Sequence, residues 1–162
     1  MNLLILGAGQ YGVVAREIAV SLNQFEKIDF LDDKNSFAIG GLNDYEKFKK
    51  EYSAAFVAIG DSEIRSKLIE NLRRVGYKLP NLISKACYIS PSAVLKDGII
   101  VEPMAVVHTN TIINNGCIIS AGAVINHNCI LEECCHIDCN ATVTNSTIIT
   151  KKTKVCSNTV FD

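Results

Sequence analysis

The chain has 162 residues, of which 48% are hydrophobic and 20% are charged, and its formal net charge is −1. This composition is typical of a compact soluble protein and argues against a disordered chain, while the near-zero charge without long basic or acidic runs argues against nucleic acid or an anionic membrane as the main partner. The N-terminus lacks the basic segment of a signal peptide, and no stretch approaches the roughly 18 apolar residues of a membrane span. An odd number of cysteines indicates reduced thiols. We therefore expect a cytoplasmic protein without membrane insertion.

The first predicted element is a buried strand over residues 2–6. It leads into a G-x-G-x-x-G sequence, residues 7–12, and an amphipathic helix over about 12–22. Glycines in this strand–turn–helix setting permit a tight turn and close backbone approach, and the helix N-terminus offers N–H donors to a phosphate or carboxylate. The motif predicts a nucleotide or nucleotide-sugar site, although the glycines could also serve only to shape the turn.

Two further strands are predicted before the chain changes character. A strand over 27–31 ends at Asp32 and Asp33, where an acidic side chain would meet a ribose or sugar hydroxyl. A strand over 55–59 leads to Gly60-Asp61 and a helix over about 62–75, and a short strand near 79–83 follows. Three or four parallel strands form only half of a dinucleotide-binding fold, so we expect an α/β, half-Rossmann-like domain over residues 1–84.

The second domain, residues 85–162, shows a six-residue repeat. Large residues occupy every sixth position without a gap: Ile89, Leu95, Val101, Val107, Ile113, Ile119, Ile125, Leu131, Ile137, Val143, Ile149, Val155 and Phe161. A period of six fits neither a helix nor a simple alternating strand. It is typical of a parallel β-helix with three short strands in each coil of 18 residues, stacked at about 4.8 Å. The repeat predicts about four coils.

A second row of mostly small residues explains most of the cysteines. It lies four positions after each large residue and includes Cys117, Cys129 and Cys135, with Cys87 in the same register. A free cysteine at such an inward position acts as a compact hydrophobe. A zinc site in the run 134–139 is therefore rejected, because an inward Cys135 prevents these side chains from converging on one ion.

The chain contains three histidines, and two of them are candidates for function. His108 is expected to be a solvated surface residue. His127 is expected near a strand's middle or edge, and His136 stands in an outward row that is otherwise mostly β-branched. Such a departure from a repeat is expected at functional sites, and the sequence suggests that both residues lie on adjacent faces of one turn. The spacings of 19 and 9 residues do not align three imidazoles, so no metal is expected.

Several motifs together resemble a known family. They are Leu4-Ile5-Leu6-Gly7-Ala8-Gly9, Phe30-Leu31-Asp32-Asp33, Val57-Ala58-Ile59-Gly60-Asp61 with Ile64-Arg65, Asn81-Leu82-Ile83, Ile89-Ser90-Pro91-Ser92-Ala93, Ser120-Ala121-Gly122-Ala123-Val124, Asn126-His127-Asn128-Cys129 and Cys135-His136-Ile137. The chain resembles the bacterial sugar O- and N-acyltransferases with a left-handed β-helix, namely sialic acid O-acetyltransferases and UDP-4-amino-sugar N-acetyltransferases.

This resemblance implies a homotrimeric acetyltransferase of surface-glycan biosynthesis, with acetyl-CoA as donor and active sites between neighbouring β-helices. His127 would be the general base, assisted by Asn128, and His136 would lie beside the acetyl-CoA thioester. A neutral imidazole suits this task near neutral pH. The acceptor, a sugar or nucleotide-sugar, would be held by eight residues of the first domain: Gly9, Gln10, Tyr11, Gly12, Asp32, Asp33, Gly60 and Asp61.

Two departures from the family pattern keep other functions open. Where the family has Gly-His-Gly in the first loop, this chain has Gln10-Tyr11-Gly12, and Asn128 replaces the acidic residue that commonly follows the catalytic histidine. The first alternative is acyl transfer to a small non-sugar acceptor such as an amino acid. The second is a non-catalytic, trimeric module that binds nucleotide-sugars.

Overall fold

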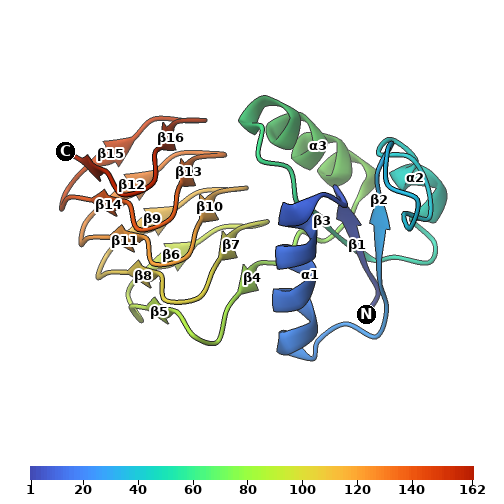
Figure 1. The fold of residues 1–162 in the computed structure, drawn as a ribbon, viewed down its shortest axis with the longest axis horizontal. Coiled ribbons are helices and arrows are strands. Elements are labelled where there is room, and N and C mark those ends of the chain that lie inside the picture. The colour runs from blue at the N-terminus through green and yellow to red at the C-terminus, as the bar shows by residue number, and fades with distance from the viewer. The chain divides into compact units, whose positions relative to one another are not determined.

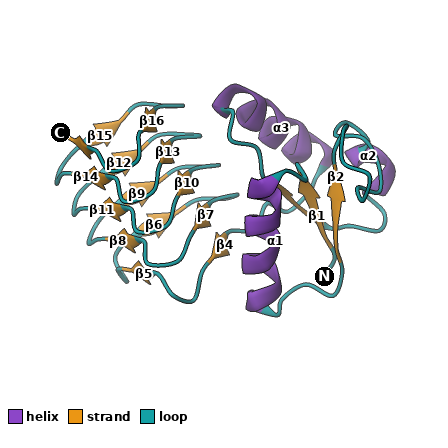
Figure 2. Ribbon diagram, viewed as in Figure 1, coloured by secondary structure: helices purple, strands orange, loops and turns teal.

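The computed structural model describes all residues, 1–162, and the chain divides into two compact units, residues 1–80 and 81–162. The first unit is an α/β domain. Its elements, in chain order, are β1 (Leu3–Leu6), α1 (Gln10–Leu22), β2 (Ile28–Leu31), α2 (Tyr45–Phe48), β3 (Ala54–Val57) and α3 (Ser62–Val75). The strands form a parallel sheet in the order β2-β1-β3 (Figures 1 and 2). Every residue of β1 and β3 is buried, as continuous apolar runs of parallel strands predict.

Local signals define the helix ends of this unit. Asp61 caps the N-terminus of α3 by accepting hydrogen bonds from the backbone N–H groups of Glu63 and Ile64, both at 2.9 Å. The helix ends at Gly76, whose φ of 87° is the left-handed conformation that glycine adopts at helix C-termini. Helix α1 likewise ends at Asn23, with φ 54°. The predicted helices are confirmed, and α1 begins two residues earlier than expected.

The second unit is a parallel β-helix of two-residue strands, which confirms the predicted fold and its left hand. The strands are β4 (Leu82–Ile83), β5 (Tyr88–Ile89), β6 (Val94–Leu95), β7 (Ile100–Val101), β8 (Val106–Val107), β9 (Ile112–Ile113), β10 (Ile118–Ile119), β11 (Val124–Ile125), β12 (Ile130–Leu131), β13 (His136–Ile137), β14 (Thr142–Val143), β15 (Ile148–Ile149), β16 (Lys154–Val155) and β17 (Val160–Phe161). The strand expected near 79–83 belongs here, because β4 pairs with β7.

Three sheets form the faces of the prism. We call them the first face (β4, β7, β10, β13, β16), the second face (β5, β8, β11, β14, β17) and the third face (β6, β9, β12, β15). The large residues of the repeat point inward, and the row from Val101 to Ile149 is fully buried. Cys117, Cys129 and Cys135 lie in the same core with no exposed surface, so their predicted packing role is confirmed.

The three corners of the prism share one backbone conformation. A left-handed residue recurs every 18 positions at each corner, as at Asn110, Asn128 and Ser146 between the second and third faces. Asparagine is several-fold enriched among residues with positive φ, because its short polar side chain tolerates that region. We call this the second–third corner, and it carries two of the three histidines.

Candidate active site

The glycine-rich loop of the first unit borders a cavity of about 390 Å³. This volume lies in the range of small-molecule sites, roughly 300–1,000 Å³. The lining residues come from the ends of the parallel strands and the loops that follow them, and they are Gly7, Gly9, Gln10, Tyr11, Asp32, Asp33, Lys34, Leu42, Ala58, Ile59 and Gly60. Six of the eight predicted acceptor-binding residues therefore line one cavity.

The other two predicted residues, Gly12 and Asp61, do not line it. A Cβ added at Gly12 would overlap the carbonyl oxygen of Gly7, so this glycine lets α1 pack closely against the loop after β1. The Asp61 carboxylate accepts hydrogen bonds from the backbone N–H groups of Glu63 and Ile64, in the first turn of α3. The sequence motif thus mixes residues that border the cavity with residues that only shape its walls.

The two aspartates after β2 differ in what their carboxylates contact. Asp32 accepts the backbone N–H of Ala8 on Oδ2 at 2.8 Å, and those of Lys34 and Asn35 on Oδ1 at 2.8 and 3.1 Å. These backbone donors, that of Ala8 above all, lower the pKa of Asp32. Asp33 is exposed and uses Oδ1 to accept the N–H of Leu42 at 2.8 Å. Asp32 therefore holds the two loops together, and Asp33 is better placed to meet a ligand.

Two cationic residues of this region were not predicted as site residues. Lys34 lines the cavity directly after the aspartate pair. Arg65 is buried, with 1% of its surface exposed, and its Nη1 donates to the carbonyl oxygens of Ile59 and Gly60 at 2.8 Å each. An arginine on the buried face of an amphipathic helix was the available signal for Arg65, since such a cation needs specific acceptors.

His127, which the sequence placed near a strand's middle or edge, lies two residues beyond β11, in the turn to β12 at the second–third corner. Its imidazole is half-buried, and Nδ1 lies 2.9 Å from the side-chain amide nitrogen of Asn128. The ring of His108, one coil earlier, meets it edge to face with 6.3 Å between centroids. His108 is exposed, and its Nδ1 accepts the backbone N–H of Thr109 at 3.0 Å. The corner therefore presents two imidazoles to the surface.

His136 lies on the first face, in β13, where its register neighbours are Ile118 and Lys154. Its Nε2 lies 3.1 Å from the hydroxyl oxygen of Ser120 and 3.9 Å from Oδ1 of Asp138. Burial opposes ionisation of Asp138, but the Cys139 N–H and the Lys154 ammonium, 3.0 Å away, outweigh it and lower the pKa of this carboxyl. The imidazole of His136 is thus mostly buried and has polar neighbours in Ser120 and Asp138.

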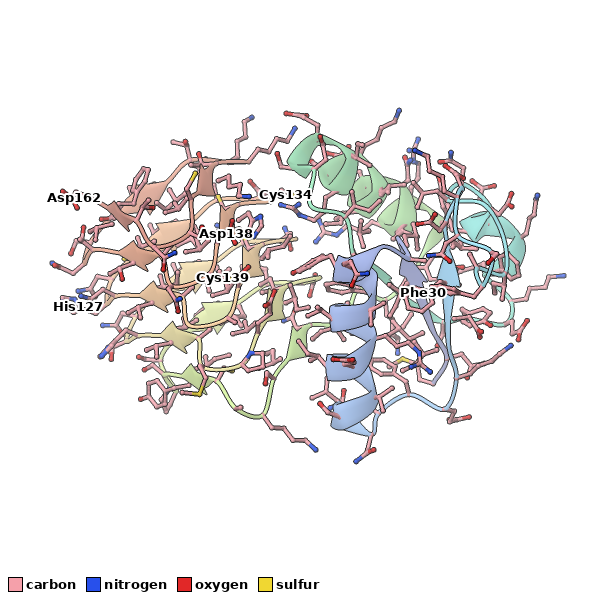
Figure 3. All side chains as sticks on the ribbon, in the orientation of Figure 1. Phe30, His127, Cys134, Asp138, Cys139 and Asp162 are labelled. Atoms are coloured by element: carbon pink, nitrogen blue, oxygen red, sulfur yellow. The ribbon has the colours of Figure 1, made fainter.

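One chain does not bring the two candidate histidines together. His127 occupies the corner between the second and third faces, and His136 projects from the first face, which lies opposite that corner in a triangular prism. Figure 3 shows His127 at one edge of the β-helix and Asp138, two residues after His136, away from that edge. The predicted placement on adjacent faces of one turn is wrong, because nine residues are half a coil.

No group of three or more histidine, cysteine, aspartate or glutamate side chains in the structure is arranged to hold a metal ion. None of its helices combines the length and apolar character needed to cross a membrane.

Comparisons with known proteins relate the chain to one group of enzymes. Residues 2–72 match the family model of the PglD N-terminal domain. The whole chain is similar to the acetyltransferase domain of PglB from Neisseria gonorrhoeae FA1090, with 29% identity and a TM-score of 0.81 over 98% of this chain and 87% of that one. These matches bear out the predicted resemblance to the bacterial sugar acyltransferases of the hexapeptide β-helix type, and the predicted enzyme class, an acetyltransferase.

Two further structures that are similar to this chain contain bound ligands. The same PglB domain in complex with acetyl coenzyme A matches with 29% identity and a TM-score of 0.76, over 98% of this chain and 86% of that one. A mutant of perosamine N-acetyltransferase from Caulobacter crescentus, in complex with CoA and GDP-perosamine, has the same fold, with 23% identity and a TM-score of 0.81 over 99% of this chain and 90% of that one.

Proposed function

We propose that this acyltransferase moves the acetyl group of acetyl-CoA to an amino or hydroxyl group of a nucleotide-linked sugar in surface-glycan biosynthesis, with His127 as general base. The observation that carries the proposal is the imidazole of His127, which is accessible at a corner of the β-helix and oriented through Nδ1 by Asn128. With Nδ1 engaged, Nε2 is the nitrogen left to meet a substrate.

The chemistry follows from the acceptor's needs. An attacking amine or hydroxyl must lose a proton as it bonds to the thioester carbonyl carbon, and an imidazole within hydrogen-bonding reach can take that proton. The carbon–sulfur bond then breaks, and the proton leaves with the CoA thiolate. Backbone N–H groups of a β-helix turn could bind the oxyanion that develops on the carbonyl oxygen.

The cavity of the first unit supports a nucleotide-linked acceptor. It combines a glycine-rich loop with an exposed carboxylate, Asp33, and a cation, Lys34, which suit sugar hydroxyls and phosphates respectively. A perosamine N-acetyltransferase of the same fold binds GDP-perosamine. Tyr11 lines the cavity where the family has a histidine, so the acceptor sugar contacts a phenol here instead of an imidazole.

The surface around His127 supports a homotrimer. The third face carries a ladder of outward aliphatic residues in register: Val94, Ile112, Ile130 and Ile148. Val94, Ile112 and Ile148 are 47%, 36% and 59% exposed. An exposed apolar ladder fits burial against a neighbouring prism, and a three-fold ring can bring the first face of that prism against it.

A trimer would also reunite the two histidines. Because one chain holds them on opposite sides of the prism, the proposed site combines His127 of one copy with His136 of the partner subunit. Mixing His127→Ala chains with His136→Ala chains, each inactive alone, tests this arrangement. Random reassembly should leave a quarter of the sites with both histidines, so about a quarter of the activity should return. No recovery would mean that both residues act from one chain.

The catalytic claim is tested by thiol release from acetyl-CoA in the presence of UDP- and GDP-linked amino sugars. His127→Ala should lower kcat by roughly 10²- to 10⁴-fold. Ser157→Ala is the matched control, because Ser157 is exposed at the same turn position of a different corner. Turnover with amino acids but not sugars would instead support a small non-sugar acceptor. Nucleotide-sugar binding without any thiol release would support the non-catalytic module.

A further inference from the structure

The side chain of Asn128 lies between His127 and a second asparagine. One end of its amide is 2.9 Å from His127 Nδ1, and the other end, Oδ1, is 3.4 Å from Nδ2 of Asn110 on the preceding coil. Asn110 and Asn128 have φ of 56° and 60°, so both stand at the same left-handed position of consecutive coils. The three side chains form one chain of hydrogen bonds that ends on the imidazole.

The direction of this hydrogen-bond chain decides what His127 can do. A neutral imidazole carries its proton on one nitrogen only. If the Asn128 NH₂ group donates to Nδ1, the proton of His127 resides on Nε2, and Nε2 cannot act as a base. If the Asn128 oxygen faces Nδ1, the proton resides on Nδ1 and Nε2 presents a lone pair.

Both directions use the same heavy-atom positions, because turning an amide over exchanges its oxygen and nitrogen. Asn110 also carries both a donor and an acceptor, so the two amides can reverse together without loss of a hydrogen bond. An aspartate next to His127 would offer an acceptor only, and this choice would not exist.

We propose that Asn110 is a positioning residue that selects the tautomer of His127 through Asn128. When Asn110 accepts from the Asn128 NH₂ group, Asn128 accepts from Nδ1–H, and Nε2 of His127 becomes the base. The importance of this tautomer for activity rests on the proposed function, whereas the tautomer itself is a property of the free protein.

Asparagine at a left-handed corner is not unusual in itself. Asn140 and Asn158 make the same 3.4 Å amide contact at another corner, with φ of 55° and 57°, and neither amide has a hydrogen bond to a histidine. Asn140 is therefore the matched control, with the same backbone, exposure and amide contact as Asn110 but without an imidazole at the end of the chain.

The experiment fixes the direction with a pure acceptor. In Asn110→Asp the carboxylate can only accept, so the Asn128 NH₂ group turns toward it and the Asn128 oxygen toward His127. Imidazole ¹⁵N chemical shifts at a pH where His127 is neutral report the tautomer, and the chain has only three histidines to assign. We expect Nδ1–H to dominate in Asn110→Asp, and Asn140→Asp to match wild type.

A double-mutant cycle shows whether the effect passes through the middle residue. In Asn128→Ala the relay is absent, so adding Asn110→Asp should no longer move the His127 tautomer. In the acetyl-transfer assay, Asn110→Asp should raise kcat by about twofold with KM unchanged if both directions are equally populated in wild type.

Unchanged ¹⁵N shifts in Asn110→Asp, or an equal change in the Asn128→Ala background, would overturn the proposal. If the shifts move as expected but wild type releases no thiol with any acceptor, the tautomer relay stands and the proposed function fails.

Discussion

Replacing Asp32 by asparagine tests how the cavity of the first unit is held in shape. The Asp32 carboxylate receives three backbone N–H groups, from Ala8 on one oxygen and from Lys34 and Asn35 on the other. Asparagine keeps a single acceptor oxygen. In its better orientation it retains the Lys34 and Asn35 hydrogen bonds and turns its NH₂ group toward the N–H of Ala8, so that one donor faces another.

The cost follows from that lost hydrogen bond. Ala8 is buried, with 2% of its surface exposed, and leaving its N–H unpaired costs about 1–3 kcal/mol. Because the carboxylate itself is half-buried and partly screened by solvent, we expect the low end, about 1–2 kcal/mol of unfolding free energy. For a chain of this size that corresponds to a fall in Tm of roughly 2–8 °C.

The pH dependence has a definite sign. Since the folded state lowers the pKa of Asp32, its contribution is fully present above the unfolded-state value of about 4 and is lost as the pH falls through the lower folded value. The stability difference between wild type and Asp32→Asn should therefore be largest near neutral pH and shrink in acid.

Thermal unfolding at pH 7 and at low pH, together with hydrogen exchange of the Ala8 amide, measures this effect. Asp33→Asn is the control, because the hydrogen bond that Asp33 accepts from the N–H of Leu42 survives on the asparagine oxygen. Equal stability of the Asp32 and Asp33 variants, or an Ala8 amide that exchanges as slowly as in wild type, would refute the reasoning.

Three further predictions concern the β-helix. Asn128→Asp places a carboxylate against Nδ1 of His127 and favours the protonated imidazole. The acid limb of the pH–rate profile should therefore move to higher pH by roughly 0.5–1 unit, and an unmoved limb would contradict this contact. Ile148→Arg should convert the proposed trimer to smaller species in analytical ultracentrifugation, with loss of activity. Leu131→Ala should cost about 2–5 kcal/mol in urea unfolding because Leu131 is fully buried, whereas Val160→Ala, at an exposed position, should change stability by about 0.5 kcal/mol or less.

The β-helix could be predicted from the sequence because its repeat is strictly local. Each coil uses the same 18-residue spacing, so one row of aliphatic residues defines the core, the strands and the register at once. The same logic placed Cys117, Cys129 and Cys135 inside. The first unit was predictable for a similar reason, since its strand–turn–helix motifs are contiguous in the chain.

The candidate site was harder to predict because its contacts join distant segments. Nothing in the spacing shows that Asp32 binds the backbone of Ala8, or that Arg65 binds the carbonyl groups after β3, because both contacts depend on how the loops fold over the strand ends. Lys34 was overlooked for the same reason.

The sequence by itself predicted the fold, the enzyme family and, in His136, one imidazole that departs from a mostly β-branched row. The tertiary structure decided which side of the prism each histidine occupies. A coil of 18 residues has three faces, so nine residues carry the chain from a corner to the opposite face, and His127 and His136 lie apart although they are close in sequence. The structure also placed Asn110 beside Asn128, because residues 18 apart stack on neighbouring coils.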